Sequence, residues 1–357
     1  MKMDLKDLGF TTWHFKKLIQ FQYPEHNLSR VIAVNKDNYI IRNREAELTA
    51  EITGKIMYGS ESNLDFPTVG DWVYVHYFNE NNFAIIHDIL PRKSLIKRKV
   101  AGEKIEYQAI AANIDIAFIV QSLDINFNTR RLERYLIMAN ESNIEPVILL
   151  SKRDLISAEK LEQAISDIKH MQHKYDIFAF SNITGEGLDE IKEALKPSIT
   201  YCLLGSSGVG KTTLLNRLIG ENLYATSPVR EKSGKGRHVT ARRQLIILDQ
   251  GGLIIDTPGM RELGNIEIHT GLDHTYAHIK KLSQGCRFRN CSHTTEPGCT
   301  VLSALNNGEL SEEQYHNYLK IRKESEYYEM SYLEKRNKDK KFGKMYKNYK
   351  TMINKKK

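Results

Sequence analysis

The sequence predicts a multidomain protein of mixed class, with a small all-β domain, a larger α/β domain and a helical C-terminal domain. Three observations carry this prediction. Short β-branched and aromatic segments crowd residues 29–89, apolar strand and helix patterns alternate over residues 109–255, and three of the four cysteines lie within fourteen residues of one another near the C-terminal end. A chain of 357 residues suits two or three domains better than one compact core.

Composition and the start of the chain limit the function classes. Hydrophobic residues make up 41% of the chain and charged residues 27%, an ordinary balance for a soluble globular protein. No stretch approaches the roughly 18 apolar residues of a membrane span, and the start, MKMDLKDLGF, lacks the apolar core of a signal peptide. We therefore expect a cytoplasmic protein with no membrane partner. Because the sequence carries no clear signal for an oligomer, we expect a monomer.

The positive charge is concentrated at the C-terminal end. Residues 335–357 hold eleven Lys and Arg and one acid, a net charge of +10, whereas the whole chain carries +8 and the preceding residues therefore −2. A strongly basic tail is typical of segments that bind nucleic acid. A solvated end that only aids solubility is the alternative.

The N-terminal part predicts a small β-barrel. The strands are expected at Arg30–Val34, Tyr39–Arg42, Ala46–Ile52, Asp71–Phe78 and Phe83–Leu90. Five short strands in about sixty residues suit a closed barrel, and the OB-fold is the best-known barrel of that size. Another small β-domain is the alternative. The basic, turn-rich segment Pro91–Gln108 is expected to be a linker, so the first domain is placed at residues 1–104.

The middle of the chain predicts a doubly wound α/β domain over residues 105–269, because apolar strands and amphipathic helices alternate. We expect buried, parallel strands at Ile114–Gln121, Pro146–Leu150, Tyr175–Ala179, Thr200–Leu204, Gln244–Leu248 and Leu253–Ile255. Helices are expected at Thr129–Asn140, Glu159–His170, Leu188–Leu195 and Lys211–Ile219. Residues 270–357 are expected to form a helical domain with the cysteine cluster, a charged helix at about Ser311–Lys335 and the basic tail.

The strongest motif is a phosphate-binding loop, G-x-x-x-x-G-K-[ST], between an apolar strand and an amphipathic helix. The loop and the threonine after it comprise Gly205, Ser206, Ser207, Gly208, Val209, Gly210, Lys211, Thr212 and Thr213. The glycines let backbone N–H groups turn toward phosphates, and the helix N-terminus adds a favourable dipole. We expect Lys211 to act in catalysis by reaching the β- and γ-phosphates, and the Thr212 hydroxyl to bind Mg²⁺. A chance Gly-rich turn is the alternative that this context disfavours.

Two segments after this loop complete a phosphate site. Asp256 ends an apolar strand in the sequence Asp-Thr-Pro-Gly, where its carboxylate can hold Mg²⁺ through water and Gly259 lets a backbone N–H approach the γ-phosphate. The Gly-rich basic loop Ser233–Thr240 lies between the phosphate loop and Asp256 in the sequence. Thr240 is expected to sense the γ-phosphate and Mg²⁺ as a switch residue.

A base-reading segment precedes the phosphate loop in the chain. Ser151, Lys152, Arg153 and Asp154 follow an apolar strand and resemble the N-K-x-D guanine reader of GTPases, with Ser in place of Asn. Asp154 would accept hydrogen bonds from guanine N1 and N2, which adenine does not offer, and Lys152 would lie along the base. The base reader usually follows the phosphate loop, so this order is circularly permuted. Because the pocket forms from loops at one edge of a sheet, the permuted order is compatible with one intact site.

The cysteine cluster predicts a metal site. Cys286, Cys291, His293 and Cys299 provide three thiolates and one imidazole, a closed tetrahedral set that suits one structural Zn²⁺ and leaves no position for catalytic water. Free thiols near an unrelated histidine are the alternative. Arg287, Phe288 and Arg289 inside the cluster suit contact with RNA or packing.

These motifs together resemble a known family, the circularly permuted, small-subunit-dependent ribosomal GTPases called RsgA or YjeQ. The resemblance includes Val69–Val73, Ala111–Asp115, GSSGVGKTT, GKGRH, DTPG and the spaced cysteines and histidine. It implies an OB domain, a permuted GTPase domain and a zinc domain. It also implies binding to the small (30S) ribosomal subunit and its rRNA in late maturation, with GTP hydrolysis stimulated by the subunit. The chain departs from the family pattern at Ser151 and Val239.

Two functions from different classes remain at this point. Intact Lys211, Thr212 and Asp256 favour the GTPase, which is the first of the two. One is a GTPase that cycles on ribosomal RNA, and the other is a nucleotide-independent rRNA-binding scaffold with a silent phosphate loop. An ATP-using protein is a third reading, which Asp154 disfavours. Where many GTPases have a water-orienting Gln, this chain has Met260, so we expect slow hydrolysis by the isolated protein. His238 is the candidate for the catalytic group that orients the water, and contact with RNA or shaping of the loop is the alternative.

Overall fold

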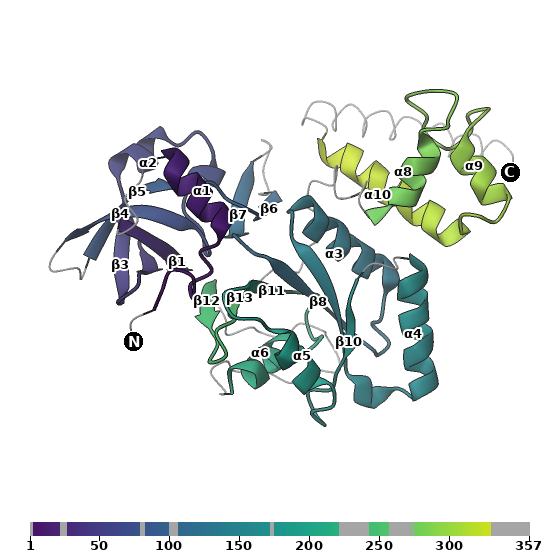
Figure 1. The fold of residues 1–357 in the computed structure, drawn as a ribbon. Coiled ribbons are helices and arrows are strands. Elements are labelled where there is room, and N and C mark those ends of the chain that lie inside the picture. The colour runs from purple at the N-terminus through teal and green to yellow at the C-terminus, as the bar shows by residue number, and fades with distance from the viewer. Residues whose placement is uncertain are drawn as a thin grey trace, which may run out of the picture.

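The computed structural model describes most of the chain. The described residues are 3–21, 27–78, 83–99, 106–171, 175–220, 243–256, 272 and 275–329. They form a β-barrel, an α/β unit and a helical C-terminal unit, which follow one another from left to right in Figure 1. No helix among the described residues is long and apolar enough to cross a membrane.

The N-terminal unit is a closed five-stranded barrel, as predicted. Its strands are β1 (Leu28–Val34), β2 (Tyr39–Arg42), β3 (Glu47–Ile52), β4 (Trp72–Phe78) and β5 (Phe83–Ile89). They pair in the order β1-β2-β3-β5-β4, and a β1–β4 pairing closes the ring. Small and β-branched side chains from all five strands fill the interior, as the inward half of each alternating strand must. The short helix α2 (Gly54–Gly59) lies between β3 and β4 in the sequence.

The expected linker is partly wrong. Residues 95–99 form β6 (Leu95–Lys99), which pairs antiparallel with β7 (Tyr107–Ala112) in a two-stranded sheet. The basic composition concealed the strand, because its charged residues are outside the core while Ile96 is buried. The helix α1 (Thr12–Phe21), which was not predicted, buries His14 and Leu18 one turn apart.

The α/β unit contains the predicted doubly wound sheet. Its strands are β8 (Ile116–Ser122), β9 (Glu145–Ser151), β10 (Ile177–Ala179), β11 (Thr200–Leu204), β12 (Gln244–Ile247) and β13 (Leu253–Asp256), in the order β10-β9-β8-β11-β13-β12. All pairings in this unit are parallel except β12–β13. The expectation of parallel strands throughout is therefore wrong for β12, because the five-residue turn between β12 and β13 is too short for a parallel crossover.

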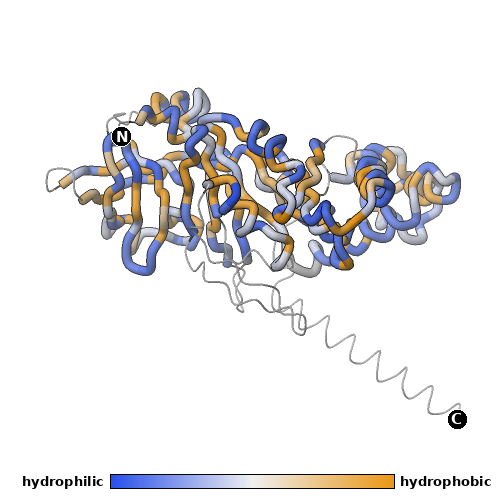
Figure 2. The backbone as a smooth tube through the Cα atoms, turned by 90° about the horizontal axis from the view of Figure 1, so that it is seen from below, coloured by the Kyte–Doolittle hydropathy of each residue, from blue (hydrophilic) through white to orange (hydrophobic). Residues whose placement is uncertain are grey.

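Helices cover both faces of this sheet. Helices α3 (Thr129–Glu141) and α4 (Ala158–Met171) share one hydrophobic core with the strands, and α5 (Leu188–Ala194) and α6 (Lys211–Ile219) share the other. Alternate residues of a strand pack into the two cores: Ile119 lies in the core on one face of the sheet, and Phe118 and Val120 lie in the core on the other. Figure 2 shows the resulting hydrophobic stretches along the strands.

The barrel is tied to the α/β sheet through buried contacts. Strand β1 pairs with β12 at Ala33 and Gln244. The fully buried Arg30 donates from its side chain to the carbonyl oxygens of Leu8, Gly70 and Asn113, and burial lowers its pKa to about 10. Three buried carbonyl acceptors satisfy a guanidinium that would otherwise be costly to remove from water.

The C-terminal unit is helical, as predicted. Helices α8 (Ala277–Ser283), α9 (Thr300–Asn306) and α10 (Glu312–Glu329) enclose a small core that includes Ile137 of α3. Helix α10 matches the start of the charged helix expected at 311–335. The basic tail, 335–357, lies outside the described residues.

Candidate nucleotide and metal sites

The loops expected to bind a nucleotide meet at one edge of the sheet. Strands β8, β9, β10, β11 and β13 are parallel, so their carboxyl ends point the same way. The chain winds outward from β8 to β10 and then returns to β11 on the other side of β8. The point between β8 and β11 is therefore the topological switch point, where open α/β sheets bind ligands. The phosphate loop follows β11 at this point.

Three glycines give the phosphate loop its shape. Gly205, Gly208 and Gly210 have φ angles of 145°, 80° and 93°, in the region that glycine adopts most readily. A Cβ at Gly205 would lie 2.4 Å from the carbonyl oxygen of Val120. Helix α6 begins directly after Gly210, so its free N–H groups face the loop. This geometry suits a phosphate group.

The lysine of the loop is positioned by the loop itself. The Lys211 ammonium donates to the carbonyl oxygens of Gly205 and Ser206, each at 2.7 Å. Val209 is buried against the second core, whereas Ser207 and Gly208 are exposed and Thr212 and Thr213 are half-buried in the first turn of α6. The Lys211 ammonium is therefore held in place by the carbonyl groups of the phosphate loop.

Asp256 lies where the Mg²⁺-binding carboxylate is expected. It ends β13, the strand next to β11. Burial raises the pKa of Asp256, and the positive charge of Lys211 opposes that rise. The carboxyl group and the ammonium therefore belong to one site. The predicted residues His238, Thr240 and Gly259 lie outside the described residues.

The predicted guanine-reading segment adjoins the phosphate loop. Ser151 is fully buried at the end of β9, and its hydroxyl lies 2.7 Å from the carbonyl oxygen of Val209. Lys152 has a φ of 62°, an uncommon backbone conformation for a lysine, which turns the chain after the strand. Arg153 donates to the carbonyl oxygen of Ile156. Asp154 is exposed, as an acceptor for a base must be.

The loop after β10 completes this side of the pocket. The Ser181 hydroxyl donates to the Asp154 carboxylate and accepts from the backbone N–H groups of Ile183 and Thr184, both at 3.1 Å. The Asn182 amide donates to the carbonyl oxygen of Gly210 at 3.1 Å. The loop at Ser181 and Asn182 thus contacts both the predicted base reader and the phosphate loop.

Two contacts were not predicted from the sequence. Lys152 donates to the Asp124 carboxylate at 2.7 Å; burial raises the pKa of Asp124, but this bond and those from Asn126 and Ser122 lower it to about 2. Arg131 at the start of α3 donates to the Ser206 hydroxyl at 3.2 Å. An acid just after an apolar strand is a signal that could have indicated Asp124, whereas no local pattern indicates Arg131.

The four predicted metal ligands converge. The ligand atoms of Cys286, Cys291, His293 and Cys299 all lie within 4.8 Å of one another. The His293 Nδ1 lies 3.4 Å from the Cys299 Sγ and 3.6 Å from the Cys286 Sγ. These spacings suit four ligands around one small ion, with thiolate and imidazole donors of the kind that Zn²⁺ prefers. We refer to these residues as the Cys₃His cluster.

Helix α10 holds the cluster in shape. The Tyr315 hydroxyl donates to the carbonyl oxygen of His293 at 2.6 Å, and Arg322 donates to that of Cys291 at 3.3 Å. His293 has a φ of 60°, a strained conformation that these contacts support. All four ligands are used in a closed set, which fits a structural site.

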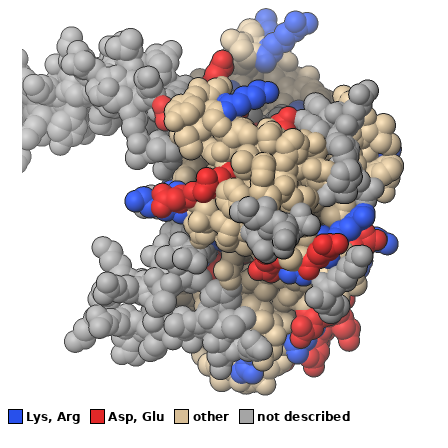
Figure 3. Space-filling model, turned by 90° about the vertical axis from the view of Figure 1, so that its left-hand side faces the viewer, with Lys and Arg blue, Asp and Glu red and all other residues tan. Residues whose placement is uncertain are grey.

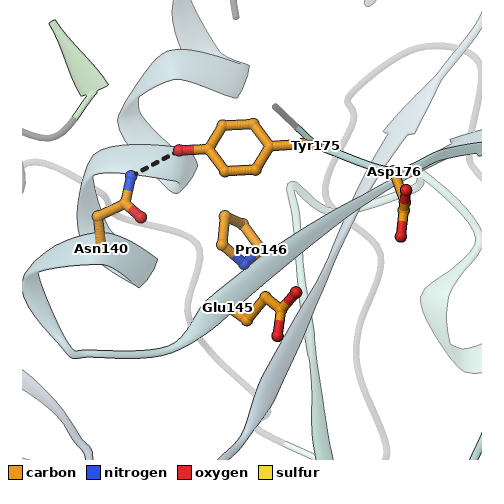
Figure 4. A pocket seen from close by; sticks show the side chains of 5 residues that line it. All are labelled: Asn140, Glu145, Pro146, Tyr175 and Asp176. Carbon is orange, nitrogen blue, oxygen red and sulfur yellow. Dashed lines mark hydrogen bonds between the residues drawn. The ribbon is translucent and has the colours of Figure 1, made fainter. Parts of the chain in front are cut away.

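The described residues also line a cavity away from the nucleotide edge. It has a volume of about 250 Å³ and is lined by Asn140, Glu145, Pro146, Tyr175 and Asp176 (Figure 4). Glu145 begins β9 and Asp176 precedes β10, so the cavity is at the opposite edge of the sheet. It takes no part in the nucleotide site.

Comparisons with known proteins agree with this geometry. The RsgA GTPase family matches residues 89–266. The small ribosomal subunit biogenesis GTPase RsgA 1 of Bacteroides thetaiotaomicron is 39% identical over 326 residues, which cover 91% of this chain and 90% of that protein.

Two solved structures are similar. The crystal structure of YjeQ from Thermotoga maritima has a TM-score of 0.63 and 26% identity, covering 84% of this chain and 98% of that one. The structure of YloQ, a circularly permuted GTPase, shares the fold with a TM-score of 0.58 and 24% identity, covering 85% of this chain and 97% of that one. The phosphate loop at the switch point, the base-reading loops that precede it in the chain and these similarities lead to one conclusion: the chain belongs to the RsgA family of GTP-hydrolysing enzymes.

Proposed function

We propose that this GTPase binds the small (30S) ribosomal subunit and acts in its late maturation, with GTP hydrolysis stimulated by the subunit. The names of the similar proteins, which are small ribosomal subunit biogenesis GTPases, support this over nine-tenths of the chain. The observation that carries the enzymatic part is the convergence of Lys211, Asp256 and Asp154 on one edge of the sheet.

In this proposal the residues of the two sites have distinct roles. The loop from Gly205 to Thr213 holds the phosphates, and Mg²⁺ is bound by Thr212, Thr240 and Asp256 and neutralises phosphate charge. Residues Ser151–Asp154 read guanine. Zn²⁺ at the Cys₃His cluster stabilises the C-terminal domain and takes no part in the reaction.

The proposed domains are residues 1–104, 105–269 and 270–357. The first boundary falls between β6 and β7, so both domains contribute to that hairpin. The barrel, the cluster region around Arg287 and Phe288, and the basic tail contact rRNA. The Arg287 guanidinium lies 5.7 Å from the ring centre of Phe288, which is 43% exposed, so this pair offers a charge and a stacking face together.

The barrel itself contributes little net charge to this contact. On the barrel end of the molecule, Lys and Arg are interspersed with Asp and Glu among the described residues (Figure 3). The tail, with its net charge of +10, is therefore the main source of phosphate affinity in this proposal. The chain works as a monomer in the cytoplasm, where its subunit partner is made.

One experiment tests the proposal. GTP and ATP hydrolysis by the purified protein are measured with and without small ribosomal subunits. We expect slow GTP turnover alone, a large stimulation by small subunits and no comparable effect of large subunits or with ATP. Lys211→Ala, which removes the phosphate-binding ammonium, is the control for contaminating activity. GTP turnover that small subunits do not change contradicts the proposed partner.

A further inference from the structure

Helix α3 contacts the phosphate loop at one end and the C-terminal domain along the rest of its length. Arg131 in its first turn donates to the Ser206 hydroxyl at 3.2 Å. One turn later, the Arg134 Nη2 donates to both carboxylate oxygens of Glu324 of α10, at 2.8 and 2.6 Å. Further along the same helix, Ile137 packs in the core of the C-terminal domain. Asn140 donates to the Thr275 hydroxyl at 3.1 Å.

These contacts follow a regular spacing of three residues. Positions 131, 134, 137 and 140 lie on one i, i+3 row of the helix, so they form a continuous stripe. The stripe begins at the nucleotide edge of the sheet and ends against the domain that carries the Cys₃His cluster. One rigid element therefore joins the two sites.

The charges of the first turn of α3 point to an anionic partner. This turn contains Arg130 and Arg131 and no acid. A helix N-terminus carries partial positive charge, so arginines there are unfavourable unless negative charge lies close by. The Glu133 carboxyl group interacts with Arg130, whereas Arg131 contacts the phosphate loop. The phosphate loop, which Arg131 already touches, is where the negative charge of a nucleotide would be.

We propose that α3 couples nucleotide binding at the phosphate loop to the docking of the C-terminal domain. Arg131 acts on the nucleotide side, and the Arg134–Glu324 pair acts on the domain side. This coupling requires only nucleotide binding, which the family membership supports, and it does not depend on the proposed action on the small ribosomal subunit.

The switch is a choice of partner for Arg131. In the structure, the guanidinium donates to the neutral Ser206 hydroxyl. A phosphate oxygen is a stronger, charge-assisted acceptor, so a γ-phosphate competes for the guanidinium, whereas the shorter GDP leaves the Ser206 contact in place. Because GTP and GDP interact differently with Arg131, they favour different positions of α3.

The packing of α3 carries this shift to the C-terminal domain. Its buried residues Leu132, Tyr135, Leu136, Met138 and Ala139 fit a close-packed core, which resists local deformation, so the helix moves as one body. The Arg134 and Glu324 side chains are 27% and 32% exposed, so their ion pair can break and re-form at low cost. The Arg134–Glu324 ion pair can therefore break and re-form in a new position when α3 moves.

The test follows hydrogen exchange in α10 of the full chain with its metal bound, in saturating GDP and in a non-hydrolysable GTP analogue. We expect the wild type to differ by at least threefold in exchange rates between the two nucleotides. Arg131→Gln is expected to remove that difference. Lys169→Gln, which removes an exposed charge from α4, is the matched control and is expected to retain it.

Charge reversal tests the domain side. Arg134→Glu and Glu324→Arg are each expected to remove the nucleotide-dependent difference, and the double variant is expected to restore it. If the reversed helices do not fold, Glu324→Gln serves instead and is expected to reduce the difference. Titration of each variant with nucleotide separates loss of coupling from loss of binding.

Two results overturn the proposal. One is a nucleotide-dependent difference in α10 that persists in Arg131→Gln at saturation. The other is the absence of any difference in a wild type that binds both nucleotides. Neither result bears on stimulation by the small subunit, which is measured separately.

Discussion

The Ser151 hydroxyl donates to the carbonyl oxygen of Val209, so one buried side chain joins the end of β9 to the phosphate loop. The same hydroxyl lies 3.2 Å from the carbonyl oxygen of Gln121 on β8. Ser151 occupies the place where the guanine-reading motif usually has Asn. In this chain, therefore, the residue at that position stabilises the phosphate loop through a buried hydrogen bond.

Ser151→Ala is expected to weaken both folding and nucleotide binding. Removing the donor leaves a buried carbonyl unsatisfied, which costs about 1–3 kcal/mol. Denaturant unfolding and titration with a fluorescent GDP analogue measure the two effects. Ser283→Ala, which removes an exposed hydroxyl from α8, is the control and is expected to change neither. Wild-type affinity in Ser151→Ala means that the phosphate loop does not depend on this bond.

Asp154→Asn is expected to shift selectivity from guanine toward xanthine nucleotides. The carboxylate, oriented by the Ser181 hydroxyl, is exchanged for an amide that can donate to a xanthine oxygen. Hydrogen bonds to a charged group contribute about 1.5–3 kcal/mol, so GTP affinity should fall about tenfold or more. Competition titrations with GTP, XTP and ATP measure the shift. Unchanged GTP affinity removes Asp154 from the guanine reader.

Cys291→Ser is expected to abolish binding of one zinc ion per chain and to destabilise the C-terminal domain. Three remaining ligands no longer close the tetrahedral site, and the backbone held by Tyr315 and Arg322 loses its support. Metal analysis and proteolysis of the purified protein provide the measurements. Retained binding of GTP serves as the internal control for folding of the α/β unit, because the pocket lies at the sheet edge, whereas the affinity itself is free to change through α3. Full zinc content in this variant contradicts the assignment.

His238→Ala is expected to lose subunit-stimulated GTP turnover while GTP binding and subunit binding persist. An imidazole can accept a proton from the attacking water, a role that the Met260 thioether does not fill. His238 lies outside the described residues, so this prediction rests on the sequence. Single-turnover hydrolysis with and without small subunits measures it. Retained stimulation indicates that a ribosomal group orients the water.

The docking of the C-terminal domain is expected to weaken as the pH rises through about 7. Burial raises the pKa of Glu133 on α3 from 4.5 to about 7, with Tyr276 acting in the opposite direction and the nearby Glu313 adding to the rise. A carboxyl group whose pKa is raised in the folded state stabilises that state, and this contribution is fully present below the unfolded pKa of about 4.5. That stability falls by roughly 1.4 kcal/mol per pH unit until the pH exceeds the folded pKa.

Glu133→Gln tests this pH dependence, because the amide does not titrate. Hydrogen exchange in α8 and α10 is followed from pH 5 to pH 8 after correction for the intrinsic rate. We expect the wild type to lose protection over this interval and the variant to change much less. Equal pH profiles for the two proteins exclude Glu133 as the source.

The sequence by itself determined the features that depend on local spacing. The phosphate loop, the guanine-reading segment and the Cys₃His cluster are short patterns whose chemistry is set by residue type and interval. Alternating apolar residues likewise predicted the barrel strands and most of the α/β elements. The pattern failed at β6, where basic side chains concealed a strand, and at β12, where a short turn imposed an antiparallel pairing.

Only the tertiary structure decided which distant residues touch. Ser151 meets Val209 across 58 residues, Arg131 meets Ser206 across 75, and Arg134 meets Glu324 across 190. Such contacts depend on how helices pack on a twisted sheet, and residues far apart in the sequence have no local pattern that encodes their distance. The sequence therefore specified the chemistry of each site. Packing decided that the phosphate loop contacts the predicted base reader directly and reaches the C-terminal domain through α3.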